Sequence, residues 1–284
     1  MSLISLLLAL SLERARRIGA NWWWQHVFHW WLQRFDSKTA FWQIMMTVIF
    51  PTGLLAGLQF GLSGWLFGIP SLLLWIFVPL FTLGCPPLQQ AYRDYLRLAA
   101  AGKQQACLEF NQLLLNQMHP MHQVEENQPL AVSTGTQLMW LNYRYYFAVI
   151  FFYVLAGPAG AVFYGCCRSL YLHKSTEVQA LSPAVNVFMH YIDWLPSRLA
   201  SLCYLTVGHT HPALPIWLRS LTDRHHSNGY WLSKVAVAAE LSNSDLVSDM
   251  LCVTTTSRFV SLAKHGILLA IAVIAALTIG GWLI

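Results

Sequence analysis

The stretch from residue 185 to residue 207 places ionisable side chains in an otherwise apolar sequence. Asp193 lies in this stretch, with His190 three residues before it and Arg198 five residues after it. A carboxylate and a guanidinium in apolar surroundings are costly unless they are paired or hold a ligand. Such groups can clamp a phosphate or act as a general base. The stretch is therefore the first candidate for a ligand-binding or catalytic site, and a structural ion pair or a chance surface pair are the alternatives.

A proline separates the two charges. Pro196 cannot donate a backbone hydrogen bond to the carbonyl of Ile192, which favours a kink. Residues five apart on a straight helix do not face each other, so Asp193 and Arg198 would pair only across such a kink. We therefore predict that residues 185–207 form a broken or re-entrant membrane segment. An amphipathic helix on the membrane surface is the alternative.

Polar residues at the ends of two other apolar stretches are further candidates. Asn142 and Arg144 precede the stretch that begins at Tyr145. They either anchor it at the membrane interface or line a polar pocket with Asp193. Glu13 ends the first apolar run and is either an interfacial charge or a member of the same pocket.

A polar turn after Asp223 contains Ser227, Asn228 and Gly229. A turn of this composition can bind a phosphate group. The chain has neither a G-x-x-x-x-G-K-[ST] nor a G-x-G-x-x-G motif, so these motifs give no support to nucleotide binding. The candidate ligand-binding residues are Asp193, Arg198, Asn142, Arg144, Glu13, His190, Ser227 and Asn228.

Histidine and cysteine spacings do not predict a metal site. His119 and His122 are spaced H-x-x-H, and His209 and His211 are spaced H-x-H. A metal site needs three or four converging ligands, and no H-E-x-x-H motif is present. None of the six cysteines forms a C-x-x-C pair, so we expect packed free thiols.

The composition identifies the class of protein that must position these residues. Of the 284 residues, 56% are hydrophobic and only 10% are charged, whereas soluble domains carry about 25% charged residues. This excludes a disordered chain and a coiled coil, and it predicts an all-α polytopic membrane protein. The net charge is +5, and the basic residues are scattered beside apolar stretches. We therefore expect the lipid bilayer, and no nucleic acid, as a partner.

Apolar stretches of about 20 residues predict membrane spans. With the segment at 185–207, they give four to five membrane segments within a single domain, residues 1–284. Pro158 predicts a bend in the third span. Gly53, Gly57 and Gly61 repeat every four residues, a spacing that permits helix packing or a homo-oligomer. The four predicted spans are residues 42–62, 65–83, 145–165 and 266–284.

Basic residues predict the orientation of these spans. Residues 13–41 carry five basic residues and residues 84–144 carry four, whereas the turn at 63–70 carries none. The positive-inside rule places the two basic segments in the cytoplasm. We therefore predict that residues 84–137 form a cytoplasmic helical loop, ending in irregular chain from residue 119.

The N-terminal region has two distinct parts. The apolar run that opens the chain predicts a retained helix over residues 1–20, half-inserted or tilted in the membrane. Residues 21–35 contain five tryptophans, and tryptophan is enriched at membrane interfaces. We predict an interfacial helix there.

Several runs of residues resemble the AmpE family across essentially the whole chain. The most specific is Asp193-Trp194-Leu195-Pro196-Ser197-Arg198-Leu199. That family is in turn similar to the CbiB/CobD family of membrane enzymes in cobalamin synthesis, whose acidic, proline, arginine and leucine residues match this run. The chain departs from the CbiB/CobD pattern, because it has one acidic residue where those enzymes have two, and it lacks a proline between Ser227 and Asn228. The other runs that carry the AmpE resemblance are Glu13-Arg14, Leu141-Asn142-Tyr143-Arg144-Tyr145-Tyr146 and Gly157-Pro158.

The resemblance implies a regulatory or sensory protein of the bacterial inner (cytoplasmic) membrane. It implies a link to a peptidoglycan-recycling amidase and to β-lactamase induction, an antibiotic response, and it does not assign an enzymatic activity. The alternative is a membrane amide-forming ligase of the CbiB/CobD type, which would use ATP with Mg²⁺ on an unknown substrate. A transporter is a third hypothesis, weakened by the absence of an internal repeat.

Overall fold

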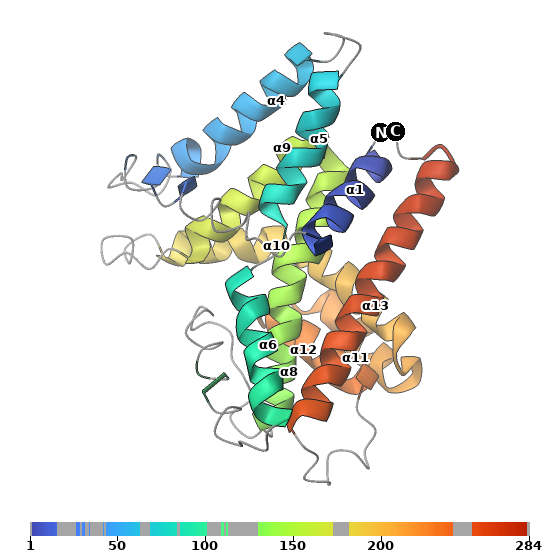
Figure 1. The fold of residues 1–284 in the computed structure, drawn as a ribbon. Helices are drawn as coiled ribbons and strands as arrows, with labels where there is room; N and C mark the ends of the chain where they lie inside the picture. Colours follow the sequence, from blue (N-terminus) through green and yellow to red (C-terminus); the bar gives the residue numbers. More distant parts are fainter. Residues whose placement is uncertain are drawn as a thin grey trace. The chain divides into compact units, whose positions relative to one another are not determined.

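The computed structural model contains helices as the only regular elements in the part of the chain that it describes (Figure 1). The predicted all-α fold is confirmed. Three helices, Met45–Leu62, Val132–Leu172 and Thr254–Ile279, are long and apolar enough to cross a membrane. The chain divides into two compact units. The residues that the structure describes are 2–15, 27–28, 30–31, 34, 42, 44–62, 69–83, 86–100, 109–110, 112, 130–172, 182–240 and 252–282.

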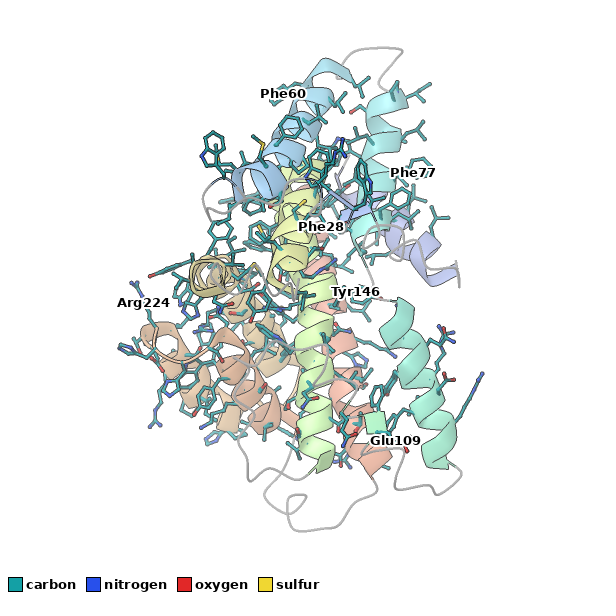
Figure 2. All side chains as sticks on the ribbon, turned by 90° about the vertical axis from the view of Figure 1, so that its left-hand side faces the viewer. Phe28, Phe60, Phe77, Glu109, Tyr146 and Arg224 are labelled. Carbon is teal, nitrogen blue, oxygen red and sulfur yellow. The ribbon has the colours of Figure 1, made fainter. Side chains whose placement is uncertain are left out.

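Unit 1 comprises residues 1–87, 145–189 and 274–284. In this unit α9 packs against α4 and α5, and α5 also packs against α1 (Figure 1). Phe60 is 82% exposed and Phe77 is also exposed, and both lie on the outside of the unit in Figure 2. Exposed phenylalanines on uncharged helices are suited to lipid. The helices are α1 (Ser2–Ala15), η1 (Met45–Ile49), α4 (Phe50–Leu62), α5 (Ile69–Thr82) and α9 (Ala148–Leu172).

The predicted spans correspond to these helices with shifted ends. The span at 42–62 corresponds to η1 and α4, and the span at 65–83 corresponds to the shorter α5. The span at 266–284 lies largely within α13 (Cys252–Ile279), which starts well before it. The predicted interfacial helix at 21–35 falls mostly outside the described residues. Within it, the indole of Trp31 donates to the carbonyl of Met46 at 3.2 Å.

Helix α9 turns back on itself at a glycine. Ala156 (φ −134°, ψ 17°) and Gly157 (φ 65°, ψ −152°) leave the helical conformation. The rings of Phe152 and Tyr164 stack with centroids 5.3 Å apart, whereas residues twelve apart on a straight helix lie about 18 Å apart along its axis. The two halves therefore fold against each other. The bend predicted in this span is present, but residues 145–165 do not form one continuous crossing helix as we predicted.

Small residues allow this fold-back. A Cβ atom added at Gly160 would overlap the carbonyl oxygen of Phe152 in the opposing half. A Cβ atom at Gly157 would lie 3.1 Å from the indole of Trp75, and its positive φ disfavours every residue except glycine. Close approach and backbone conformation both require glycine here.

Unit 2 comprises residues 88–144 and 190–273. Helix α8 (Leu130–Asn142) forms its core, because its side chains from residue 132 to residue 141 are all buried. Helix α12 (Asn228–Glu240) packs against both α8 and α11 (Thr210–Thr222) (Figure 1). The ring of Phe259, from α13, lies so close to Gly135 that a Cβ atom there would overlap it.

The prediction for residues 84–137 needs correction at its end. Leu130–Gln137 is not part of a loop, as expected for residues 84–137, but the first part of buried helix α8. Within the same predicted loop, α6 (Pro86–Ala100) is helical, and the ring of Tyr95 stacks on Phe110 at 4.7 Å. Helix α6 is therefore helical as predicted, and Tyr95 packs it against Phe110 through an aromatic contact.

The segment at 185–207 is not broken. Helix α10 (Ser182–Val207) continues through Pro196, and it is not among the helices with the length and hydropathy of a membrane span. Proline removes one backbone hydrogen bond, but Asp193, Ser197 and Arg198 beside it are buried and hydrogen-bonded to other parts of unit 2 or to each other. These tertiary contacts hold the helix together across the proline.

We predict that Gly157→Ala lowers the free energy of unfolding by about 1–3 kcal/mol, because alanine is strained at this backbone conformation. The measurement is thermal unfolding of the detergent-purified protein. Gly57→Ala is the matched control, since a Cβ atom at Gly57 meets nothing within 4 Å in helix α4. Equal melting temperatures for the two variants would contradict the assigned role of Gly157.

Candidate functional site

A group of buried polar side chains lies in unit 2, at contacts between α10 and the neighbouring helices. We call it the Asp193 cluster. Each of its members is less than a tenth exposed. The members are Tyr143, Arg144, Asp193, Ser197, Arg198, Ser220 and Asn228.

Asp193 accepts a hydrogen bond from the hydroxyl of Tyr143 at 2.9 Å. A guanidinium nitrogen of Arg144 lies 3.6 Å from the other carboxylate oxygen. The guanidinium of Arg144 also lies over the ring of Trp140, 4.8 Å from its centroid. The buried carboxylate therefore has a cation and a hydroxyl donor beside it, as a buried charge requires.

Tyr143 and Arg144 begin a π-helical turn, η3 (Tyr143–Phe147), that interrupts the α-helical chain between α8 and α9. Neighbouring residues on a regular α-helix do not face the same partner. Here both side chains reach Asp193. Such π turns occur frequently at functional sites, and no hydrophobic pattern in the sequence indicated this one.

Arg198 makes a second set of contacts. Its Nε donates to the carbonyl of Ser220 at 2.9 Å, and its Nη1 donates to Ser197 Oγ at 3.3 Å and Asn228 Oδ1 at 3.4 Å. Its own carbonyl accepts from the indole of Trp217 at 3.0 Å. Burial lowers the pKa of Arg198 to about 10, so the side chain stays charged at neutral pH. All its acceptors are neutral groups.

Buried polar atoms that have no hydrogen-bond partner among the described residues include Arg198 Nη2, Trp194 Nε1, Asn142 Oδ1 and Gln137 Oε1. Two are donors on α10 and two are side-chain amide oxygens on α8. Buried polar atoms are nearly always hydrogen-bonded in proteins, so a group of unpartnered ones calls for an explanation. A ligand with complementary polar groups would supply the missing partners.

Asn228 links α12 to two points on α10 at the cluster. Its Nδ2 donates to the carbonyl of His190 at 2.7 Å, while its Oδ1 accepts from Arg198. It is also the first residue of α12. Ser227 Oγ accepts from the backbone N–H of Tyr230 at 3.2 Å, so Ser227 caps this helix.

The polar turn before α12 is held by an acidic side chain. Asp223 accepts hydrogen bonds from the backbone N–H of His225, at 2.8 Å, and from the ring of His226. These hydrogen bonds lower the pKa of Asp223. Arg224 in this turn is exposed and points outward in Figure 2. The hydrogen bonds of Asp223 therefore stabilise the backbone conformation of this turn.

The structure brings several predicted site residues together. Asp193, Arg144, Arg198 and Asn228 belong to the cluster, and His190 contributes a carbonyl to it. The alternative of an ion pair between Asp193 and Arg198 across a kink is not what the structure shows, because Asp193 pairs with Arg144 and Arg198 contacts neutral groups.

Three other predicted site residues are not members of the Asp193 cluster. Asn142 is half-buried and contributes one of the unpartnered oxygens. Ser227 acts as a helix cap. The side chain of Glu13 lies outside the part of the structure that is described.

Sequence reasoning missed several residues of the site. Tyr143 could have been found, because it directly precedes Arg144 in a run already selected. Ser220 and Trp217 contribute to the surroundings of Arg198 from α11, and they carry no motif. Within the described ranges, no three His, Cys, Asp or Glu side chains lie close enough to hold a metal ion.

The fold and the cluster define an all-α membrane protein with a charged polar site buried among its helices. A family model described as regulatory signalling modulator protein AmpE matches residues 1–284, and the chain belongs to this family. It is 29% identical over 294 residues to Protein AmpE of Shigella flexneri, with 100% of both chains covered. No solved structure matches the chain. The predicted resemblance to AmpE is confirmed, and the chain is a regulatory membrane protein.

The further resemblance to the CbiB/CobD family stays a prediction. The matched family is described as regulatory, and neither the family nor the relative supports the ligase hypothesis.

We predict that Asp193→Asn lowers the free energy of unfolding by about 3–5 kcal/mol, because it leaves the buried guanidinium of Arg144 beside a neutral group. Chemical unfolding in detergent measures this. Asp94→Asn is the matched control: Asp94 and Arg97 also lie 3.6 Å apart, but their side chains are 54% and 80% exposed. We expect that control to change stability by less than about 1 kcal/mol. Similar losses in the two variants would contradict the role of burial.

We predict a pH effect at His190. Burial and the nearby charge of Arg198 lower the pKa of His190, although Asp193 acts in the opposite direction. The unfolded chain therefore binds this proton at a higher pH than the folded chain does. The resulting stabilisation is complete above about pH 6.5 and is lost as the pH falls through the folded-state pKa.

The melting temperature of the wild-type protein should consequently fall more between pH 7 and pH 5 than that of His190→Gln. His211→Gln, at an exposed position, is the control and should follow the wild type. If His190→Gln shows the same pH dependence as the wild type, His190 does not contribute to it.

Proposed function

We propose that the chain is a multi-pass protein of the bacterial inner (cytoplasmic) membrane that modulates the β-lactam response. On this proposal it senses a ligand from peptidoglycan recycling at the Asp193 cluster. Membership of the AmpE signalling family and three apolar helices of spanning length support the membrane and regulatory parts. The proposal that the chain senses a ligand rests on the buried polar residues of the Asp193 cluster.

One observation carries the sensory role: two buried cations connect four helical elements of unit 2. Arg144 and Tyr143 at the end of α8 contact Asp193 on α10. Arg198 on α10 contacts Ser220 on α11 and Asn228 on α12. A ligand that bound either cation would change contacts of several helices at once. Binding could thereby shift the population of two arrangements of these helices, which is how ligand switches act.

Stability alone does not account for the cluster. Replacing a buried ion pair by well-packed apolar residues is often neutral or stabilising. The cluster also leaves buried polar atoms without partners, such as Arg198 Nη2 and Asn142 Oδ1. An arrangement selected only to hold helices together would not need these atoms. A binding role explains both features.

Partners of the chain are also part of the proposal. The chain would act with a peptidoglycan-recycling amidase, as the AmpE resemblance implies. The glycines at 53, 57 and 61 have open space around them, because an added Cβ atom would meet nothing within 4 Å. That face of α4 would be free to pack against a second copy in a homo-oligomer.

The test is complementation in a bacterial strain that lacks its own copy of the gene. We expect the wild-type gene to restore the normal β-lactamase activity after exposure to a β-lactam, and Asp193→Asn to lose most of this effect. Tyr143→Phe removes only one hydroxyl from Asp193 and should lose part of it. Asp94→Asn is the control and should behave as the wild type.

Membrane levels of each variant are measured by immunoblot, so that loss of function is separated from loss of protein. Full complementation by both Asp193→Asn and Tyr143→Phe, at normal levels, would contradict a sensory role for the cluster.

A further inference from the structure

Arg198 has a buried nitrogen that donates to nothing. The side chain is 2% exposed, and its Nε and Nη1 are satisfied by Ser220, Ser197 and Asn228, whereas Nη2 has no partner among the described residues. A guanidinium presents five N–H groups in a planar fork that fits the oxygens of a carboxylate or a phosphate. Two N–H groups of this fork are therefore buried and unused.

Trp194 supplies a second unused donor near the first. Its indole Nε1 is buried without a hydrogen-bond partner. The indole ring lies one helical turn before Arg198 on α10, with its centroid 5.9 Å from Cζ of the guanidinium. Residues four apart on a helix share a face. The two unpartnered N–H donors thus belong to the same face of α10.

The N-terminus of α12 adjoins this pair. Asn228, the first residue of the 13-residue helix, accepts from Arg198 Nη1 at 3.4 Å. The N–H groups of Tyr230 and Trp231 are already directed to Ser227, at 3.2 Å and 3.4 Å. The first N–H groups of a helix have no acceptor within the helix, and its N-terminus favours negative charge. A negative group beside Arg198 would therefore also gain from the helix.

Neighbouring carboxylates are occupied elsewhere. Asp193 contacts Tyr143 and Arg144. Asp223 acts on Arg198 electrostatically, but its oxygens accept from the backbone of His225 and the ring of His226. Neither carboxylate supplies an acceptor to Arg198. The guanidinium is left with neutral acceptors only.

We propose that Arg198, Trp194 and the N-terminus of α12 form a binding site for an oxyanion, the phosphate or carboxylate group of a ligand. This inference rests on the proposed sensory function, and it names the chemistry of the ligand that the cluster senses. The anion accepts from Arg198 Nη2 and Trp194 Nε1. The group comes either from a water-soluble molecule or from a lipid headgroup, because both carry the same oxyanion.

The test uses the full-length protein in a neutral detergent and in nanodiscs. Inorganic phosphate and acetate are titrated by calorimetry into the detergent sample. A second titration uses nanodiscs made of phosphatidylcholine, with or without phosphatidylglycerol. We expect saturable binding of at least one of the two anions by the wild type, and competition with phosphatidylglycerol if the source is a headgroup.

Three variants assign the binding to this site. Arg198→Lys keeps a positive charge but lacks the fork, and Trp194→Phe keeps an aromatic ring but lacks the N–H. Each should weaken binding by about tenfold or more, as expected when a hydrogen bond to a charged group is lost. Arg219→Gln removes an exposed charge of α11 and should bind as the wild type does. Trp194→Phe leaves Arg198 in place, so it keeps the test valid if Arg198→Lys does not fold.

Two outcomes would overturn the inference: no saturable binding of either anion and no effect of phosphatidylglycerol in the folded wild type, or equal binding by the wild type and Trp194→Phe. These results are distinct from failure of the sensory proposal. If Asp193→Asn abolishes complementation while the wild type binds no anion, the sensory function stands and the oxyanion inference falls. If the wild type binds the anion but Asp193→Asn and Tyr143→Phe both complement fully, the oxyanion site stands and the sensory proposal falls.

Discussion

The burial of the Asp193 carboxylate is the constraint on which unit 2 depends. This side chain is 3% exposed, and a carboxylate removed from water needs a compensating cation and hydrogen-bond donors. Arg144 and Tyr143 meet this need only because a π-helical turn carries both residues at the end of α8. The position of α10 against α8 follows from this contact. An apolar residue at position 193 would impose no such position.

The second cation extends the same constraint to two more helices. Arg198 is buried beside neutral acceptors on α11 and α12, and its carbonyl accepts from Trp217. The charge of Asp193 is thus matched by Arg144, whereas Arg198 keeps unused donor capacity. A cluster with this imbalance is poorly suited to maximal stability and well suited to receiving an anion. Under the proposed binding of an oxyanion, stability and binding make opposite demands on these residues.

Unit 1 solves a different physical problem. Its helices expose apolar side chains such as Phe60 and Leu155, so the lipid is their solvent and backbone groups must be satisfied internally. The fold-back of α9 at Gly157 interrupts a helix in this setting, and Gly157 is buried against Trp75 rather than exposed to lipid. Arg168 on α9 is buried too and donates to the carbonyl of Thr82, where α5 ends without a further helical turn. At these two places in the described part of unit 1, protein side chains cover the point where a helix is interrupted or ends.

The sequence by itself determined the all-α membrane class, most of the apolar helices, the glycine bend and four members of the cluster, because hydropathy, glycine and isolated charges act locally. It did not determine that α10 stays straight through Pro196, that residue 130 begins a buried helix, or that Asp193 pairs with Arg144 rather than Arg198. Only the tertiary structure decided these points. The partner of Asp193 lies 49 residues away along the chain, and a buried charge chooses among all the groups that folding brings near it, not among its neighbours in sequence.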